Sequence, residues 1–180
     1  MADAAISRLV LAHLCILLVC ANSQTWAMSF SARYSRVPVV DGVLLPLSLT
    51  SQRPSVVLHP SNSQDLRALY SLLLVDLDSS RPGYPTTDIN PYVHWLVINI
   101  PGSVTSTEEI WQVGSELEPY VGPAPPTGIH RYVFYLIRQD RVSDDHPLAD
   151  RYLTSLKDFR KRYGLNVALE STYFRARPGY

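Results

Sequence analysis

The chain has 180 residues with 16 basic and 16 acidic side chains, so it is electrically neutral. Neutrality argues against a nucleic acid or an anionic membrane as a partner held by bulk charge. With 14 prolines, 11 tyrosines and only 18% charged residues, the composition favours a turn-rich β protein over a helical bundle.

Residues 1–23 are predicted to be a secretory signal peptide. A basic residue precedes the apolar run Leu9–Cys20, and the small residues Ala21 and Ser23 stand where signal peptidase reads the chain. The run is too short to cross a bilayer comfortably, so no transmembrane span is expected in the mature chain. We expect cleavage before Gln24 and an extracellular protein. Cleavage after Ala21 or after residue 27, or an uncleaved membrane anchor, are the alternatives.

Both cysteines, Cys15 and Cys20, fall within this signal peptide. The mature chain, residues 24–180, therefore has no disulfide and must be held together by burial of apolar surface. Its length fits one domain that buries roughly two-thirds of the surface of the unfolded chain.

The first half of the domain is predicted to contain short strands joined by tight turns. Residues Tyr34–Leu49 alternate loosely between apolar and polar and are interrupted by two prolines and an Asp-Gly pair. Ser55–Leu58 is a further strand, closed by a His-Pro pair. The polar segment Ser61–Arg67 is predicted to be a turn.

Three apolar runs are predicted to be the central strands: Leu69–Val75, Tyr92–Ile100 and Tyr132–Arg138. Each is short, rich in β-branched and aromatic residues, and bounded by residues that break helices. Between the first two lies Ser79–Pro91, a loop with three prolines. Loops of this length in a compact domain often carry function.

One segment near the end of the chain is predicted to be a helix. Its apolar stripe, with spacings of four, three and four, consists of Tyr152, Leu156, Phe159 and Tyr163. Arg160–Arg162 would form the last turn and Gly164 would end the helix. We interpret the basic triplet as a solvated helix end, with a docking patch as the alternative. A final strand, Leu165–Phe174, follows.

Chemically active side chains gather at the ends and in the interior of the three central strands. These side chains are Asp76, Asp78, His94, His130 and Tyr132. His94 is expected on the face opposite to Val93 and Trp95. Ionisable groups in apolar strands lower the stability of the fold unless they are paired, and groups kept there often belong to a functional site. Taken singly, each has an ordinary explanation: a satisfied buried histidine or an aspartate that caps a turn.

Together these side chains predict a small anion pocket. Asp76 beside either histidine would raise the pKa of that imidazole and favour its cation. A cationic imidazole, a tyrosine hydroxyl and free backbone amides of the turn Gly122–Thr127 would then surround the anion.

The order of these motifs resembles the phosphatidylethanolamine-binding protein family, which includes the Raf kinase inhibitor proteins of animals and the flowering regulators of plants. The resemblance covers roughly Val37–Phe174. It rests on Asp76-Leu77-Asp78, Tyr92-Val93-His94-Trp95, Pro125-Pro126 and Gly128-Ile129-His130-Arg131-Tyr132, with Arg53-Pro54-Ser55 and Phe159-Arg160-Lys161-Arg162-Tyr163 as further matches.

The resemblance implies a mainly β fold, two antiparallel sheets in a Greek-key sandwich with a few peripheral helices. It also implies a cavity for phosphate, acetate or a phosphoethanolamine head group, with no metal and no cofactor. The implied ligand-binding residues are Asp76, His94, Pro126, His130 and Tyr132, supported by Asp78, Pro125, Ala124 and Gly122.

The chain departs from the family pattern at several positions. The family's Asp-Pro-Asp-Ala-Pro segment is here Asp76-Leu77-Asp78-Ser79-Ser80, and loss of both prolines is expected to loosen it. Val93 stands where a second histidine is common, and the turn before Gly128 is about two residues shorter. Because the chain ends at Tyr180, the family's C-terminal helix over the pocket is not expected.

The function expected first is a secreted, non-catalytic binding protein for phosphate-bearing or phospholipid head groups. The alternative is a secreted inhibitor of a serine protease, with Ser79–Pro91 as the inhibitory loop, or a modulator of a signalling protein. A hydrolase that uses Asp76, His94 and His130 as a metal site or as general bases is disfavoured. The sequence has no H-x-x-x-H or H-E-x-x-H motif and no nucleophile elbow.

Overall fold

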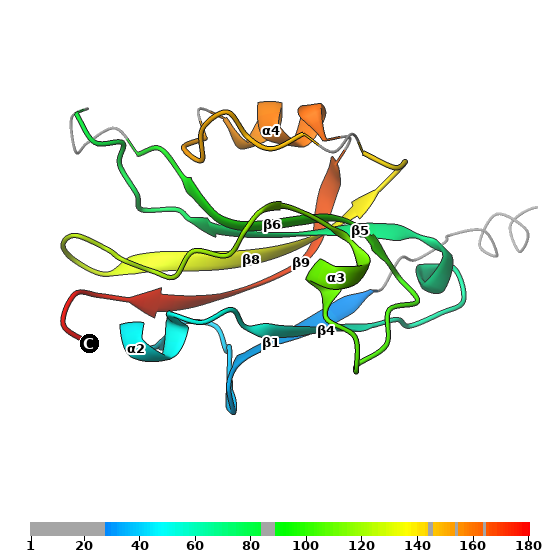
Figure 1. The fold of residues 1–180 in the computed structure, drawn as a ribbon, viewed down its shortest axis with the longest axis horizontal. Coiled ribbons are helices and arrows are strands. Elements are labelled where there is room, and N and C mark those ends of the chain that lie inside the picture. Colours follow the sequence, from blue (N-terminus) through cyan, green and yellow to red (C-terminus); the bar gives the residue numbers. More distant parts are fainter. Residues whose placement is uncertain (1–27, 84–88, 144–145, 154, 164) are drawn as a thin grey trace, which may run out of the picture.

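The computed structural model describes residues 28–83, 89–143, 146–153, 155–163 and 165–180. The predicted signal peptide with both cysteines, the centre of the Ser79–Pro91 loop and the predicted helix end at Gly164 lie outside these residues. Figure 1 draws them as a thin grey trace.

Within the described residues the chain forms two sheets (Figure 1). The smaller has the order β2-β1-β4 and consists of β2 (Val37–Pro38), β1 (Ser29–Tyr34) and β4 (Ser55–His59). The larger has the order β3-β9-β8-β5-β6-β7 and consists of β3 (Val43–Leu44), β9 (Leu165–Ala176), β8 (His130–Gln139), β5 (Leu69–Asp76), β6 (Tyr92–Pro101) and β7 (Ser115–Glu118).

The larger sheet contains a Greek key, as expected. Strands β5, β6 and β7 follow one another as antiparallel neighbours, and β8 returns to lie beside β5. One pair departs from the expectation of wholly antiparallel sheets, because β3 runs parallel to β9. The chain reaches β3 by crossing over from the smaller sheet. Such a connection, unlike a hairpin, does not force the strand to reverse direction.

Short helices lie around the sheets. They are α2 (Leu47–Thr50), the 3-10 helix η1 (Asp65–Arg67), α3 (Ile110–Val113) and α4 (Leu156–Arg162). Figure 1 shows α4 over one face of the larger sheet, while β1 and β4 lie on the other side of that sheet.

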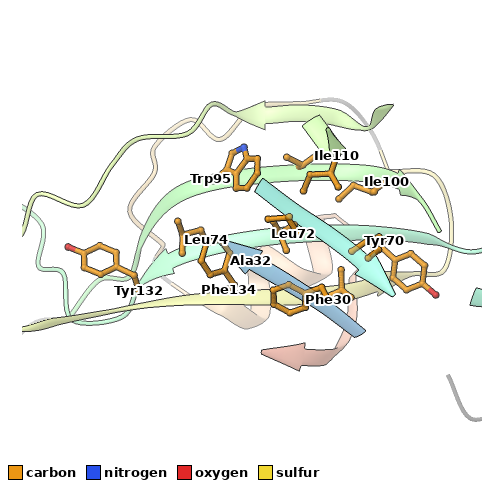
Figure 2. Packing of buried hydrophobic residues seen from close by; sticks show 14 of the residues in the cluster. Phe30, Ala32, Tyr70, Leu72, Leu74, Trp95, Ile100, Ile110, Tyr132 and Phe134 are labelled. Atoms are coloured by element: carbon orange, nitrogen blue, oxygen red, sulfur yellow. The ribbon is translucent and has the colours of Figure 1, made fainter. Parts of the chain in front are cut away.

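The larger sheet is buried on both faces. In β5, Leu72 and Leu74 belong to the apolar cluster between the two sheets, which Figure 2 shows. Leu73 and Val75 belong to a second cluster, which also contains Phe159 of α4. A strand covered on both sides reads as a continuous apolar run, and this is the pattern that predicted β5.

The predicted helix is shorter than its apolar stripe. Phe159 and Tyr163 are buried as expected, but Tyr152 lies before α4 and forms an isolated bridge with Tyr92. The backbone around Tyr152 bonds to β6 and its approach: Val93 N–H donates to the Arg151 carbonyl and Leu153 N–H to the carbonyl of residue 91. Groups used in this way cannot close a helical turn.

Candidate functional site

A cavity of about 350 Å³ opens where β5 ends and β6 and β8 begin. All five predicted ligand-binding residues line it, together with Pro125, Ala124 and Gly122 of the supporting set; Asp78 does not. The complete lining is Asp76, Ser79, Ser80, Pro82, Tyr92, His94, Val121, Gly122, Ala124, Pro125, Pro126, His130, Tyr132 and Tyr152.

Asp76 and His130 form the first fixed pair of the cavity. The sheet register places Asp76 directly beside Tyr92 on one neighbouring strand and Tyr132 on the other. Oδ2 of Asp76 lies 2.8 Å from Nδ1 of His130, and its Oδ1 accepts the N–H of Asp78 at 2.9 Å. Because Nδ1 donates to the carboxylate, Nε2 is the ring nitrogen of His130 that is left for a ligand.

Asp78 holds the start of β8 from outside the cavity. It accepts three hydrogen bonds from Arg131: the backbone N–H at 2.8 Å, Nε at 2.9 Å and a terminal guanidinium nitrogen at 2.6 Å. The side-chain bond to Arg131 is the main cause of the lowered pKa of Asp78, and burial opposes it. Asp76 thus orients the imidazole of His130, whereas Asp78 fixes the start of β8.

Leu77, at a position where the family usually has proline, also bonds to β8. Its N–H donates to the carbonyl of Arg131 at 3.1 Å. A proline has no N–H and could not make this bond. At this position the departure therefore ties the segment to β8, contrary to the loosening expected from the loss of proline.

A β-bulge turns His94 toward the cavity. Leu74 of β5 pairs with Trp95, but the next residue, Val75, pairs with Val93, so His94 is an extra residue in β6. In consequence Trp95 packs between the two sheets and Val93 packs in the cluster with α4. The expectation that these two share a face is wrong, because it assumed an unbroken alternation.

His94 is neutral in character and held in one tautomer. Its Nδ1 lies 2.7 Å from the carbonyl oxygen of Val121, which can only accept, so Nδ1 carries the proton. Burial lowers the pKa of His94 and outweighs the opposing effects of this bond and of Asp76. The expected cationic imidazole is therefore wrong for His94. Its Nε2 is again the nitrogen left for a ligand.

Tyr132 contributes a buried hydroxyl that has no hydrogen-bond partner among the described residues. Its ring stacks on Phe174 with centroids 5.2 Å apart and meets His94 edge-on at 5.1 Å. Burial, then the charge of Asp76 and an interaction with its carboxylate that falls short of hydrogen-bond geometry, raise the pKa of Tyr132 well above its ordinary value, so the group stays protonated. Figure 2 shows its hydroxyl directed away from the other labelled core residues.

Two positions in the turn between β7 and β8 favour glycine, one for lack of space and one for its backbone conformation. A Cβ on Gly122 would lie 2.9 Å from the backbone oxygen of Thr50, too close for a real contact. Gly128 has a φ of 70°, in the left-handed region that glycine adopts at little cost. Three residues of the segment Gly122–Thr127 are prolines without an N–H, so its expected supply of amides to an anion is halved.

The sequence missed six residues of the lining: Ser79, Ser80, Pro82, Tyr92, Val121 and Tyr152. The ring of Tyr92 meets both His94 and Tyr152 edge-on, with centroids 4.9 Å apart in each case. Tyr92 could have been found from the two-residue spacing to His94 along a strand. Tyr152 carried no such signal, because its spacing fitted the helix stripe.

In the described part of the chain, no three His, Cys, Asp or Glu side chains are grouped so that they could hold a metal ion. None of the helices described there is long and apolar enough to cross a membrane.

The model of one protein family matches residues 37–174, and its description is phosphatidylethanolamine-binding protein. The chain belongs to the phosphatidylethanolamine-binding protein family. The match spans the cavity and all of its predicted residues.

Individual relatives agree with this assignment. The Arabidopsis thaliana protein TERMINAL FLOWER 1 is 32% identical over 146 residues, which are 79% of this chain and 76% of the relative. A carboxypeptidase Y inhibitor, solved in complex with its cognate proteinase, has a TM-score of 0.64 at 22% identity over 84% of this chain and 83% of its own. The phosphatidylethanolamine-binding protein from Plasmodium vivax also has a TM-score of 0.64, at 20% identity over 83% and 85% of the two chains. At these identities the two structures show a shared fold.

Proposed function

We propose that this family member is a secreted, non-catalytic protein that binds phosphate-bearing head groups, phosphoethanolamine in particular. The observation that carries the proposal is the unpartnered hydroxyl of Tyr132 at a cavity whose two histidines also keep one nitrogen each for a ligand. A buried hydroxyl without a partner costs about 1–3 kcal/mol, and a bound acceptor removes that cost.

A phosphate group suits this set of atoms. The hydroxyl of Tyr132 donates to one phosphate oxygen. Nε2 of His94 and Nε2 of His130 each face a further phosphate oxygen. The unprotonated Nε2 of His94 accepts the proton of a phosphate hydroxyl, or takes up a proton that it then donates to the anion. The bonds from Nδ1 to Val121 and Asp76 fix the direction of both rings.

The ammonium end of phosphoethanolamine suits the aromatic side of the cavity. Tyr92 and Tyr152 line the cavity, and their ring faces attract a cation. Both oxygens of Asp76 already accept hydrogen bonds, so we assign Asp76 chiefly to orienting His130. Its charge also favours a zwitterion over a bare anion.

We infer binding without chemical conversion from how the polar groups are used. Nδ1 of each histidine is bonded elsewhere, and neither Ser79 nor Ser80 is bonded to an imidazole. A serine nucleophile needs a base within hydrogen-bond reach, and the geometry offers none to these two.

Calorimetric titration of residues 24–180 with phosphoethanolamine, and separately with inorganic phosphate, tests the proposal. We expect both to bind the wild type and both to bind the variant His130→Ala at least tenfold more weakly, because a charge-assisted hydrogen bond is worth about 1.5–3 kcal/mol. The control is His59→Ala, which removes an exposed histidine of β4. No heat of binding to the wild type, or equal affinity of His130→Ala, would refute head-group binding.

A second candidate function is inhibition of an extracellular serine protease. Its support is the shared fold with the carboxypeptidase Y inhibitor and the length of the Ser79–Pro91 segment. A panel of extracellular serine proteases assayed with micromolar protein tests it. Full activity of every protease at that concentration would end this candidate.

We propose export on the strength of the N-terminal pattern alone. Expression of the full chain in a eukaryotic host should give protein in the medium that begins at Gln24. Protein that stays in the cell with residues 1–23 attached would contradict export.

A further inference from the structure

A second cavity, of about 300 Å³, lies against α4. Four apolar side chains line it: Leu148, Ala149, Leu153 and Phe159. Phe159 and Leu153 are buried in the cluster beneath α4, and Ala149 is exposed. The second cavity therefore has an apolar floor, whereas the first presents two imidazoles and a hydroxyl.

The two cavities share a wall. Tyr152 lines both of them, so its side chain is part of the boundary between the first cavity and the second. The segment of residues 80–82 also borders both cavities. Ser80 and Pro82 line the first cavity, and Arg81 lines the second.

Ionic and ring contacts hold this wall in place. The guanidinium of Arg81 lies 5.5 Å from the ring centroid of Tyr152 and forms an ion pair of 2.5 Å with Asp150. Asp150 also accepts the backbone N–H of Tyr152 at 2.9 Å. The wall thus has a fixed position, and a ligand that extends past it meets an apolar surface at once.

The charges at the margin of the second cavity suit the linker of a phospholipid. Arg81 is paired with Asp150, while Arg162 donates to the carbonyl of Pro147 and adds a positive charge beside the apolar floor. Ester carbonyls accept hydrogen bonds from arginine, and acyl chains require an apolar surface. A phospholipid carries head group, esters and chains in this order, and the second cavity offers both an arginine for the esters and an apolar surface for the chains.

We propose that the second cavity is a subsite for the acyl chains of the phospholipid whose head group occupies the first cavity. This inference rests on the proposed function and extends it from free head groups to intact lipid. It assigns Leu148, Ala149, Leu153 and Phe159 to the chains and Arg162 to the ester region.

The test compares glycerophosphoethanolamine, which is the same phosphodiester without acyl chains, with dihexanoyl phosphatidylethanolamine below its critical micelle concentration, both titrated into residues 24–180. We expect the short-chain lipid to bind at least about tenfold more tightly, because each buried methylene adds to the affinity. Ala149→Trp fills the second cavity from an exposed position, and Ala149→Ser is the matched control that leaves it open. Ala149→Trp should bind both ligands within about twofold of each other and bind glycerophosphoethanolamine like the wild type.

Equal affinity of the wild type for the two ligands would overturn the subsite, as would an advantage of the lipid that survives Ala149→Trp. Lipid binding that survives His130→Ala but not Ala149→Trp would keep the subsite and overturn head-group binding in the first cavity. No binding of either ligand would overturn both proposals.

Discussion

Asp76 at the end of β5 and His130 at the start of β8 are joined by a hydrogen bond of 2.8 Å, although 54 residues separate them in the sequence. The antiparallel register that pairs Asp76 with Tyr132 makes this contact possible. Both partners are largely shielded from water, with exposed side-chain fractions of 5% for Asp76 and 12% for His130. The bond therefore fixes the imidazole at the edge of the cavity.

Replacing Asp76 by asparagine should weaken head-group binding about tenfold. Asparagine keeps the size but has a single acceptor oxygen. If that oxygen accepts the N–H of Asp78, the amide NH2 faces Nδ1 of His130, so the charge-assisted bond is lost and the imidazole must change its tautomer to keep a bond at all. The measurement is the dissociation constant of phosphoethanolamine for Asp76→Asn. A tighter constant would show that the negative charge repels the phosphate more than it helps to orient the ring.

Stability should fall in acid partly because of His94. Burial lowers the pKa of this group below its ordinary value of 6.5, so the unfolded chain takes up a proton where the folded chain does not. The contribution of neutral His94 is complete above pH 6.5 and is lost progressively below it, at no more than about 1.4 kcal/mol per pH unit.

Urea unfolding between pH 5 and pH 8 measures this effect. His94→Gln keeps a donor for the Val121 carbonyl and should flatten the acid limb of the stability curve relative to the wild type. An acid limb of the same slope in His94→Gln would contradict the assignment.

The ion pair between Asp78 and Arg131 should stabilise the protein by about 1 kcal/mol. Exposed pairs are usually worth less, and Arg131 is 53% exposed, but two hydrogen bonds from its guanidinium to the two oxygens of one carboxylate make the geometry favourable. A double-mutant cycle with Asp78→Ala and Arg131→Ala measures the coupling by urea unfolding. A coupling energy near zero would show that the pair does not hold the start of β8.

Gly122→Ala should destabilise the protein by about 1–3 kcal/mol and weaken head-group binding. The new Cβ would lie 2.9 Å from the backbone oxygen of Thr50, so the turn that lines the cavity must move. Gly128→Asn is the control, because nothing lies within 4 Å of a Cβ there and asparagine tolerates positive φ. Wild-type stability of Gly122→Ala would mean that the turn is not confined by Thr50.

The continuous apolar runs and the short motifs at their ends predicted the three central strands and most of the cavity. The three central runs are strands because they are covered on both faces, and the Asp-x-Asp, His94 and Gly-x-His-Arg-Tyr motifs meet because these strands are neighbours. Sequence patterns were less informative where contacts with distant residues decide the local structure. The stripe through Tyr152 fitted a helix, but β6 bonds to that backbone, and no local signal marks the bulge that turns His94.

Tyr132→Phe tests the central claim most directly, because it removes a buried hydroxyl of the cavity that has no hydrogen-bond partner among the described residues. If that hydroxyl serves a phosphate, the free energy of unfolding without ligand should stay equal or rise, since a buried unpaired group costs stability. The affinity for phosphoethanolamine, measured by calorimetry on the same samples, should fall at least fivefold. A ligand-free variant destabilised by about 1 kcal/mol or more, with unchanged affinity, would show that the hydroxyl serves the fold and not a ligand.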